Sequence, residues 1–353
     1  MSKKFAPSQV ARETTVVALL AFFAGAIVAG AVGASIILTQ TTSAAAYKPL
    51  RQSDLNPESS FEFTDPLIGL SAADAGTSPQ YQDLANKVSS YIADQKSKGL
   101  TSASVTFRDI RGQARFDINP SEIYTPASLY KVPLMMAYYR LAQEDPSILS
   151  ETLVYTGGQD LDAGENVRSP VQLAAGQSYS VESLIEHMIR YSDNNADQLL
   201  LQHLIAINKE SVLTQIFSDL NVNFGSLTAN TDLITPQSYL LFMRVLYNAT
   251  YLDREYSEKA LALLTTTDFA EGIAADIPNN IQIAHKFGDA NIASNGNVAG
   301  YELHDCGIVY LPDHPYMLCV MTKGKDIVAL KSVIATISQY IYQDLETRYP
   351  SQK

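Results

Sequence analysis

The sequence predicts an α+β fold in which one antiparallel sheet is built from both ends of the domain, is flanked by terminal helices, and is interrupted by a mostly helical insert. Segments with the alternation of apolar residues that strands require lie at the two ends of the domain: 102–107, 114–118, 282–287, 306–311 and 316–321. Segments with helical spacing occupy the interval between them. Strands at both ends with helices between them indicate a single shared sheet.

The first half of the predicted sheet is a hairpin that follows a helix. Apolar residues recur at helical spacing over 81–98, and Gly99 ends that helix. The next two predicted strands are separated by a turn at 109–112. A helix that carries Ser128 comes next, with Pro126 just before its expected start, where a proline costs least.

Capping residues and turn residues bound the insert and the carboxyl end. Further helices of the insert are predicted over 182–190, 195–207, 211–220, 236–248 and 258–264. Thr235 is a good N-cap, and Pro236 takes the first helical position. Residues 312–315 form a turn that makes the last two strands a hairpin. An apolar stripe predicts that 331–348 closes the domain as a long helix.

The amino-terminal residues predict one transmembrane helix ahead of the domain. An uncharged apolar run over 14–38 is long enough to cross a hydrocarbon core of about 30 Å. Positive charge ahead of this run places residues 1–13 in the cytoplasm and the rest of the chain outside. Residues 39–79 are predicted to be an extracytoplasmic linker to the domain, 80–353. A cleaved signal peptide is the alternative, since Ala44–Ala46 resembles a cleavage site, and it would make the protein secreted.

Composition and charge exclude several kinds of partner. The 353 residues carry a formal net charge of −12, which argues against nucleic acid or an anionic membrane surface as the main partner. The five histidines show no metal-ligand spacing, so no metal and no other cofactor is predicted. Cys306 and Cys319 lie on the two arms of the last hairpin and would face each other in one register only. We therefore expect buried free thiols, with a cross-strand disulfide as the alternative.

A serine and a lysine three residues apart suggest a nucleophile with its base. On a helix, Ser128 and Lys131 would lie on one face in adjacent turns. A serine hydroxyl reacts only when a base lies within hydrogen-bond reach, and a lysine can be that base when burial or nearby positive charge lowers its pKa. Ser-x-x-Lys also arises by chance on solvated helix faces, so this motif alone is weak.

A second motif lies at a polar break between two predicted helices. It contains Ser192 and Asn194. The Ser192 hydroxyl can relay a proton between Lys131 and a leaving nitrogen, and the Asn194 side chain can hold a substrate amide. Glu165 and Arg168, in the preceding Gly- and Asp-rich segment, could form one wall of a cleft, although a solvated loop is the default interpretation.

A third motif lies at the end of a predicted strand. Lys286 supplies positive charge that favours a neutral Lys131 and attracts a substrate carboxylate. Gly288 lets a substrate backbone approach the strand edge. The backbone N–H of Asp289 could then complete an oxyanion hole with that of Ser128.

In this order the three motifs resemble those of the penicillin-recognising serine enzymes, specifically class A β-lactamases, whose signature is Ser-x-x-Lys, Ser-Asp-Asn and Lys-Thr-Gly. The resemblance extends roughly over residues 80–350 and includes the helix that follows Ser192 and the last strands. It implies a bacterial serine hydrolase that forms an acyl-enzyme on Ser128, with Lys131 as base and Ser192 as the proton donor to the leaving nitrogen.

Two departures limit what the resemblance implies. Class A enzymes activate the deacylating water with a glutamate that lies before the Thr-Pro helix, but residues 220–235 contain no glutamate. Asp219 is the residue that could replace this glutamate as the water-activating base, but we expect it to end the preceding helix instead. Phe287 replaces the family's hydroxyl residue, and with Asp289 beside it the binding of a β-lactam carboxylate is in question.

The expected function is therefore β-lactam hydrolysis that is slow for want of the glutamate. A D-alanyl-D-alanine carboxypeptidase or transpeptidase acting on peptidoglycan is the alternative, and the predicted membrane tether and the missing glutamate both favour it. An inactive binding scaffold is a third hypothesis. Retention of all four of Ser128, Lys131, Ser192 and Lys286 counts against it.

Overall fold

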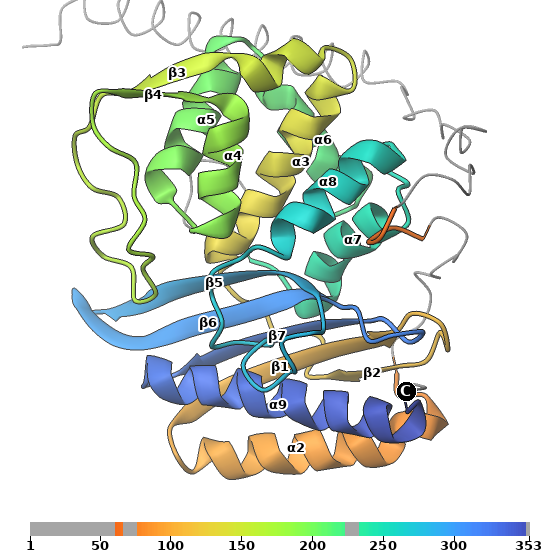
Figure 1. Ribbon diagram of the computed structural model, residues 1–353. Coiled ribbons are helices and arrows are strands. Elements are labelled where there is room, and N and C mark those ends of the chain that lie inside the picture. Colours follow the sequence, from red (N-terminus) through yellow and green to blue (C-terminus); the bar gives the residue numbers. More distant parts are fainter. Residues whose placement is uncertain (1–60, 66–75, 223–232, 351–353) are drawn as a thin grey trace, which may run out of the picture. The chain divides into compact units, whose positions relative to one another are not determined.

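The computed structural model describes residues 61–65, 76–222 and 233–350. Its centre is a five-stranded antiparallel sheet with the order β2-β1-β7-β6-β5 (Figure 1). The strands are β1 (Leu100–Asp109), β2 (Arg115–Ile118), β5 (Ile283–Ser294), β6 (Asn297–Val309) and β7 (Tyr316–Gly324). The first two come from the start of the domain and the other three from its end, which confirms the predicted sheet.

Helices cover both faces of this sheet. On one face lie α2 (Gln82–Lys96) and α9 (Ile327–Arg348), and a hydrophobic cluster fills the space beneath them. The other face carries the helical insert: α3 (Lys131–Ala142), α4 (Val181–Arg190), α5 (Asn194–Ala206), α6 (Glu210–Asp219), α7 (Pro236–Tyr247) and α8 (Arg254–Leu264). A second hydrophobic cluster joins the insert to the sheet. The predicted terminal helices and helical insert are thus confirmed.

The structure differs from the prediction mainly where strands are polar or exposed. β5 and β6 run well beyond the predicted segments, to a turn at Asn295–Gly296. The added residues were not predicted because they lack apolar alternation: the outer ends of both strands are exposed, and the buried part of β6 includes Glu302, His304 and Asp305. A small sheet of β3 (Thr152–Tyr155) and β4 (Gln177–Ser180) was not predicted, since none of its residues is buried. This pair holds the ends of the segment 156–176, which descends toward β5 in Figure 1.

The prediction of free thiols is wrong, because Cys306 and Cys319 form a disulfide. The register of β6 against β7 places the two residues directly opposite each other. Period-2 alternation assigns a residue to a face of the sheet, but the pairing of the two strands decides which residues meet. Both residues are fully buried in the cluster beneath the helical insert.

Removal of this disulfide is expected to destabilise the domain by about 3 kcal/mol, since the bond closes a short loop and so restricts the unfolded chain. The test is thermal unfolding of the Cys306→Ala/Cys319→Ala double variant, for which a fall in Tm of roughly 6–12 °C is expected. Alkylation of the denatured, unreduced parent chain should label neither cysteine. Labelling of both would contradict the disulfide.

Part of the predicted linker belongs to the folded domain. The side chain of Phe63 is buried against the ring of Tyr310, at 5.1 Å between ring centroids. Its N–H donates to Glu258 Oε1 at 2.8 Å, and the N–H of Asp65 donates to the Tyr247 carbonyl at 2.9 Å. The predicted transmembrane segment, 14–38, lies outside the described residues. No helix among the described residues is long and apolar enough to cross a membrane.

Candidate active site

The turn that carries Ser128 lies between the sheet and the helical insert. A 3₁₀ turn spans Ala127–Tyr130, and α3 begins at Lys131, so the helix starts three residues later than predicted. Ala127 has a φ of 48°, a left-handed conformation that costs a non-glycine residue on the order of 1–3 kcal/mol. Strained backbone conformations of this kind cluster at active sites, and this one directly precedes the predicted nucleophile.

Lys131 is buried between the turn and the start of α5, with 2% of its surface exposed. Its Nζ donates to the Asn194 Oδ1 at 2.6 Å and to the Ser192 backbone carbonyl at 2.5 Å, and it lies 3.3 Å from the Ser192 Oγ. The first predicted motif is therefore joined to the second by hydrogen bonds from one ammonium or amine group.

Lys286 approaches Ser192 from the sheet. Its Nζ is 2.9 Å from the Ser192 Oγ, so this hydroxyl lies within reach of both lysines. Ser192 has a φ of 56°, which makes it the second strained residue of the site. The structure thus brings all three predicted motifs together, although they come from α3, the α4–α5 break and β5.

Gly288 lies directly against the Ser128 turn. A Cβ atom added to Gly288 would lie 3.0 Å from the Ser128 N and 2.9 Å from the Pro126 carbonyl oxygen. Only glycine permits β5 to come this close to the turn. The backbones of Ser128 and Gly288 are therefore in contact, and Asp289, the second residue of the predicted oxyanion hole, follows Gly288 directly in β5.

Burial lowers the pKa values of both lysines. It lowers the pKa of Lys131, although four carboxylates around it, led by Asp197, act in the opposite direction. Burial, together with the charge of Lys131, holds the pKa of Lys286 well below that of an exposed lysine. Burial also raises the pKa of Asp197. Low pKa values at two neighbouring lysines favour a neutral amine that can accept a proton.

The ring of Phe287 is buried beside Lys286, whose Nζ lies 4.1 Å from the ring centroid. The ring also packs among the residues beneath α9, in a tilted contact with Phe269 at 4.3 Å between ring centroids. His285 turns from the site, since its Nδ1 is 2.8 Å from Asp305 Oδ1. Asp219 ends α6, as expected, and its carboxylate accepts from Gln215 and from the Tyr251 hydroxyl.

The 156–176 segment adds residues that the sequence interpretation treated as solvated. Glu165 Oε1 accepts from Asn194 Nδ2 at 2.8 Å. Asp162 Oδ1 accepts from the Asn194 N–H and its Oδ2 from the Asn195 side chain, both at 2.9 Å. Two acidic residues in a Gly- and Asp-rich stretch give no periodic signal, so their contact with Asn194 was not predicted.

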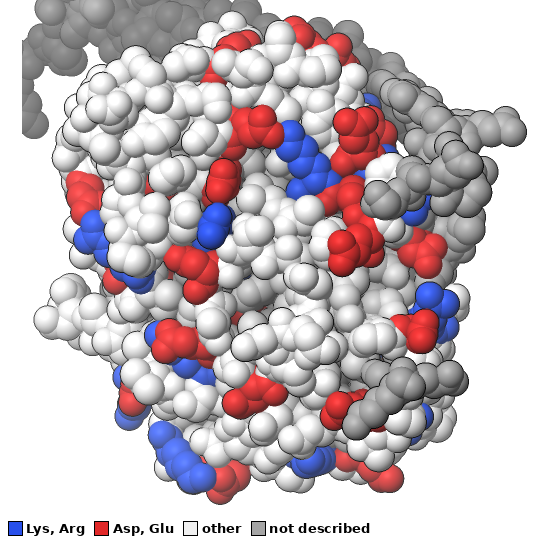
Figure 2. Space-filling view, in the orientation of Figure 1, with Lys and Arg blue, Asp and Glu red and all other residues white. Residues whose placement is uncertain are grey.

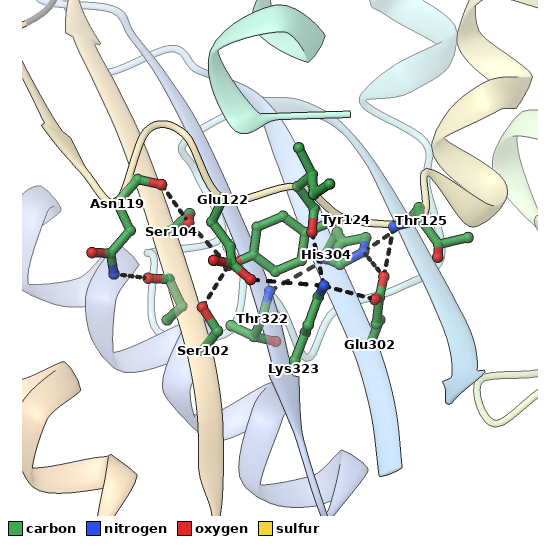
Figure 3. A network of polar contacts seen from close by, with 12 residues as sticks. Ser102, Ser104, Asn119, Glu122, Tyr124, Thr125, Glu302, His304, Thr322 and Lys323 are labelled. Carbon is green, nitrogen blue, oxygen red and sulfur yellow. Dashed lines mark hydrogen bonds and ion pairs between the residues drawn. The ribbon is translucent and has the colours of Figure 1, made fainter. Parts of the chain in front are cut away.

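A buried polar network holds the chain just ahead of the Ser128 turn (Figure 3). The Thr125 N–H donates to Glu302 Oε2 at 2.7 Å, and the Thr125 carbonyl lies 3.0 Å from His304 Nε2. His304 Nδ1 accepts from the Thr322 N–H, so Nε2 is the nitrogen left to donate. Lys323 Nζ pairs with Glu302 Oε1 at 3.3 Å. The network fixes the position of Thr125 over β6 and β7.

Replacement of Glu302 by glutamine is expected to destabilise the domain by about 2 kcal/mol at pH 7, the worth of hydrogen bonds to a buried charge. Burial acts to raise the pKa of Glu302, but its bonds from His304 and Thr125 and the charge of Lys323 lower it overall. The stabilisation that the ionised Glu302 carboxylate provides is therefore fully present above the pKa that this group has in the unfolded chain. It is lost as the pH falls through the lower pKa that the group has in the folded domain. Denaturant unfolding of parent and variant should show a gap at pH 7 that closes in acid; a gap independent of pH would contradict this role.

Fold and site together define a serine hydrolase in which a serine turn lies beside two buried lysines. Residues 83–345 match the family described as the β-lactamase enzyme family, and the chain belongs to it. The penicillin-recognising class inferred from the three motifs is thereby confirmed. No curated protein matches the sequence.

Solved structures show the same fold. The structure of PBP-A is 20% identical, with a TM-score of 0.63, and covers 78% of this chain and 100% of its own. A β-lactamase from Sphaerobacter thermophilus DSM 20745 is 21% identical, with a TM-score of 0.62, over 75% of this chain and 98% of its own. The extended-spectrum β-lactamase TLA-3 is 20% identical, with a TM-score of 0.63, over 74% of this chain and 98% of its own.

Proposed function

We propose that the chain forms an acyl-enzyme on Ser128 with β-lactams and related D-alanyl amides, and that it hydrolyses the β-lactam adduct slowly. One observation carries this proposal: Lys131 is buried, its pKa is lowered, and it joins Ser192 and Asn194 beside the Ser128 turn. A neutral lysine in this place can take the proton of a serine hydroxyl.

The proposed acylation proceeds in two steps. Lys131 takes the hydroxyl proton of Ser128 as Oγ attacks the carbonyl carbon, and the N–H groups of Ser128 and Asp289 stabilise the oxyanion. The carbon–nitrogen bond then breaks as Ser192 passes its proton to the leaving nitrogen and takes another from Lys131. Lys286, 2.9 Å from the Ser192 Oγ, favours that transfer through its own hydrogen bond.

Slow deacylation is proposed because the chain lacks the glutamate with which the family activates the deacylating water, and Asp219 does not replace it. Residues 220–235 contain no glutamate, and Asp219 is engaged with Gln215 and Tyr251. Water that attacks the Ser128 ester would then lack the base that the family supplies there. A structure of PBP-A, in a mutant form, is an acyl-enzyme complex with penicillin G.

The test is intact-mass measurement of the purified full-length chain after incubation with benzylpenicillin, beside Ser128→Ala. A lasting adduct on the parent and none on the variant is expected. Consumption of the antibiotic without an adduct would instead mean rapid turnover and would refute slow deacylation. Neither adduct nor consumption would refute the β-lactam proposal and favour an inactive scaffold.

A D-alanyl-D-alanine peptidase is the second candidate, and the missing glutamate favours it. Such an enzyme would release D-alanine from an acyl-D-alanyl-D-alanine peptide or transfer the acyl group to an amine. Analysis of the products separates it from a β-lactamase, because the peptide would be consumed while the penicillin adduct persisted.

We also propose that 14–38 anchors the chain in a bacterial cell membrane with the catalytic domain outside. The uncharged length of this run and the positive residues ahead of it support the proposal. Extraction of membranes at high pH should leave an anchored chain in the pellet. Recovery in the medium of a chain that begins after Ala46 would indicate cleavage instead.

A further inference from the structure

The amide group of Asn194, to which we assign a substrate amide, is already occupied. Its Oδ1 accepts from Lys131 at 2.6 Å, and its Nδ2 donates to Glu165 Oε1 at 2.8 Å, with the Leu161 carbonyl at 3.4 Å. The second N–H of Nδ2 has only the long contact to the Leu161 carbonyl, so a substrate carbonyl can bind Nδ2 there, beside the Glu165 carboxylate. If it displaces Glu165 instead, a hydrogen bond to a charged acceptor is replaced by a weaker one to a neutral acceptor.

The 156–176 segment holds Glu165 in this position from both sides. Asp162 binds the start of α5 through the Asn194 N–H and the Asn195 side chain. The neighbouring Asn166 donates from its backbone and side chain to Asp289 Oδ2, at 3.1 and 2.9 Å. Glu165 therefore lies where the segment passes from its contacts with α5 to its contacts with β5.

The negative charge around Glu165 favours a substrate group that donates hydrogen bonds to the Glu165 carboxylate. Its carboxylate is half-buried, and burial followed by the nearby Asp289 carboxylate raises its pKa. An amine beside the reacting carbonyl can donate N–H groups to this carboxylate and relieve the repulsion between the two acids. An acylated amine instead directs its carbonyl oxygen toward the carboxylate oxygen, which is unfavourable.

We propose that Glu165 determines the acyl specificity of the cleft: it selects acyl donors with a free amine beside the reacting carbonyl and disfavours donors in which that amine is acylated. This inference rests on the proposed acylation of Ser128. It names the substrate class as α-amino acyl compounds, and it makes Glu165 a substrate-contacting residue contributed by the 156–176 segment. It therefore counts against the peptidase candidate, because an acyl-D-alanyl-D-alanine peptide carries an acylated amine beside the reacting carbonyl.

A matched pair of β-lactams tests the proposal. 6-Aminopenicillanic acid carries the free amine, and benzylpenicillin carries the same amine acylated on the same ring system. The rate of adduct formation on the full-length chain is measured by intact mass for both compounds. The parent chain is expected to react faster with 6-aminopenicillanic acid.

Two variants separate the two effects of the carboxylate. Glu165→Gln keeps an acceptor oxygen for Asn194 and removes the charge, so it should slow 6-aminopenicillanic acid by about tenfold and change benzylpenicillin little. Glu165→Ala frees Asn194 Nδ2 as well, so it should also speed benzylpenicillin by about tenfold. Val171→Ala, which alters an exposed side chain of the same segment and leaves Glu165 and its anchoring contacts in place, should preserve the preference of the parent chain.

The outcomes distinguish this inference from the function on which it rests. A parent chain that reacts faster with benzylpenicillin, or a Glu165→Ala variant that changes both rates by one factor while its Tm is unchanged, would overturn the inference and leave the acylation of Ser128 standing. Loss of the preference in Val171→Ala would assign it to the fold of the segment and also overturn the role of Glu165. Absence of any adduct on the parent chain would refute both.

Discussion

Replacement of Lys131 by methionine is expected to slow acylation of Ser128 by about 10³-fold, the usual worth of a positioned general base. Methionine has a similar length and suits a buried site, whereas it cannot accept a proton or bind Asn194 and Ser192. Stopped incubations with benzylpenicillin, followed by intact mass, give the rate. Lys98→Met, at an exposed residue just beyond the end of α2, is the matched control and should react as the parent does.

The pH dependence of the parent chain gives an independent test of the same role. Acylation requires neutral Lys131, so its rate should rise as the pH rises through the pKa of this lysine. Because burial lowers that pKa, the rise should lie below the range of an exposed lysine, about 10.4. A rate that rises only near that value, or a Lys131→Met variant with normal acylation, would contradict the assignment.

Gly288→Ala is expected to lower the acylation rate by about 10²-fold with a smaller effect on stability. The added methyl group would lie 3.0 Å or less from backbone atoms of Pro126 and Ser128, so the turn or β5 must move. A shift of about 1 Å at a reacting group can cost this factor. Acylation rates and thermal unfolding of the variant measure the two effects separately.

Ala293→Val, on the exposed outer end of the same strand, is the matched control for added volume and should keep the parent's acylation rate. A Gly288→Ala variant that reacts as fast as the parent would show that the close approach of β5 to the turn is dispensable. Equal loss of activity in both variants would instead indicate a general weakness of β5.

Site residues that belong to short motifs could be recognised before the structure. Ser128 and Lys131 lie three residues apart, and Ser192 and Asn194 two apart, so local spacing alone places each pair in one turn of chain. The order of the three motifs along the chain then associated Lys286 with these two pairs. The sequence does not report distance between motifs, and the hydrogen bonds of Lys131 and Lys286 to Ser192 come from the fold.

Residues whose role depends on pairing or on an irregular segment could be named from the sequence only as alternatives. Cys306 and Cys319 required the register of β6 on β7, which alternation does not specify. Glu165 lies in a segment without periodicity, and its contact with Asn194 arises because the segment is fastened to α5 and β5.

The sequence by itself determined the α+β class, the family and the identities of the proposed catalytic groups, because apolar periodicity and short motifs are local properties of the chain. Only the tertiary structure decided the lowered pKa values of the lysines, the disulfide and the hydrogen-bond partners of Asn194. Burial and contacts between segments remote in sequence set these properties, since desolvation and hydrogen bonding depend on what surrounds a group in space.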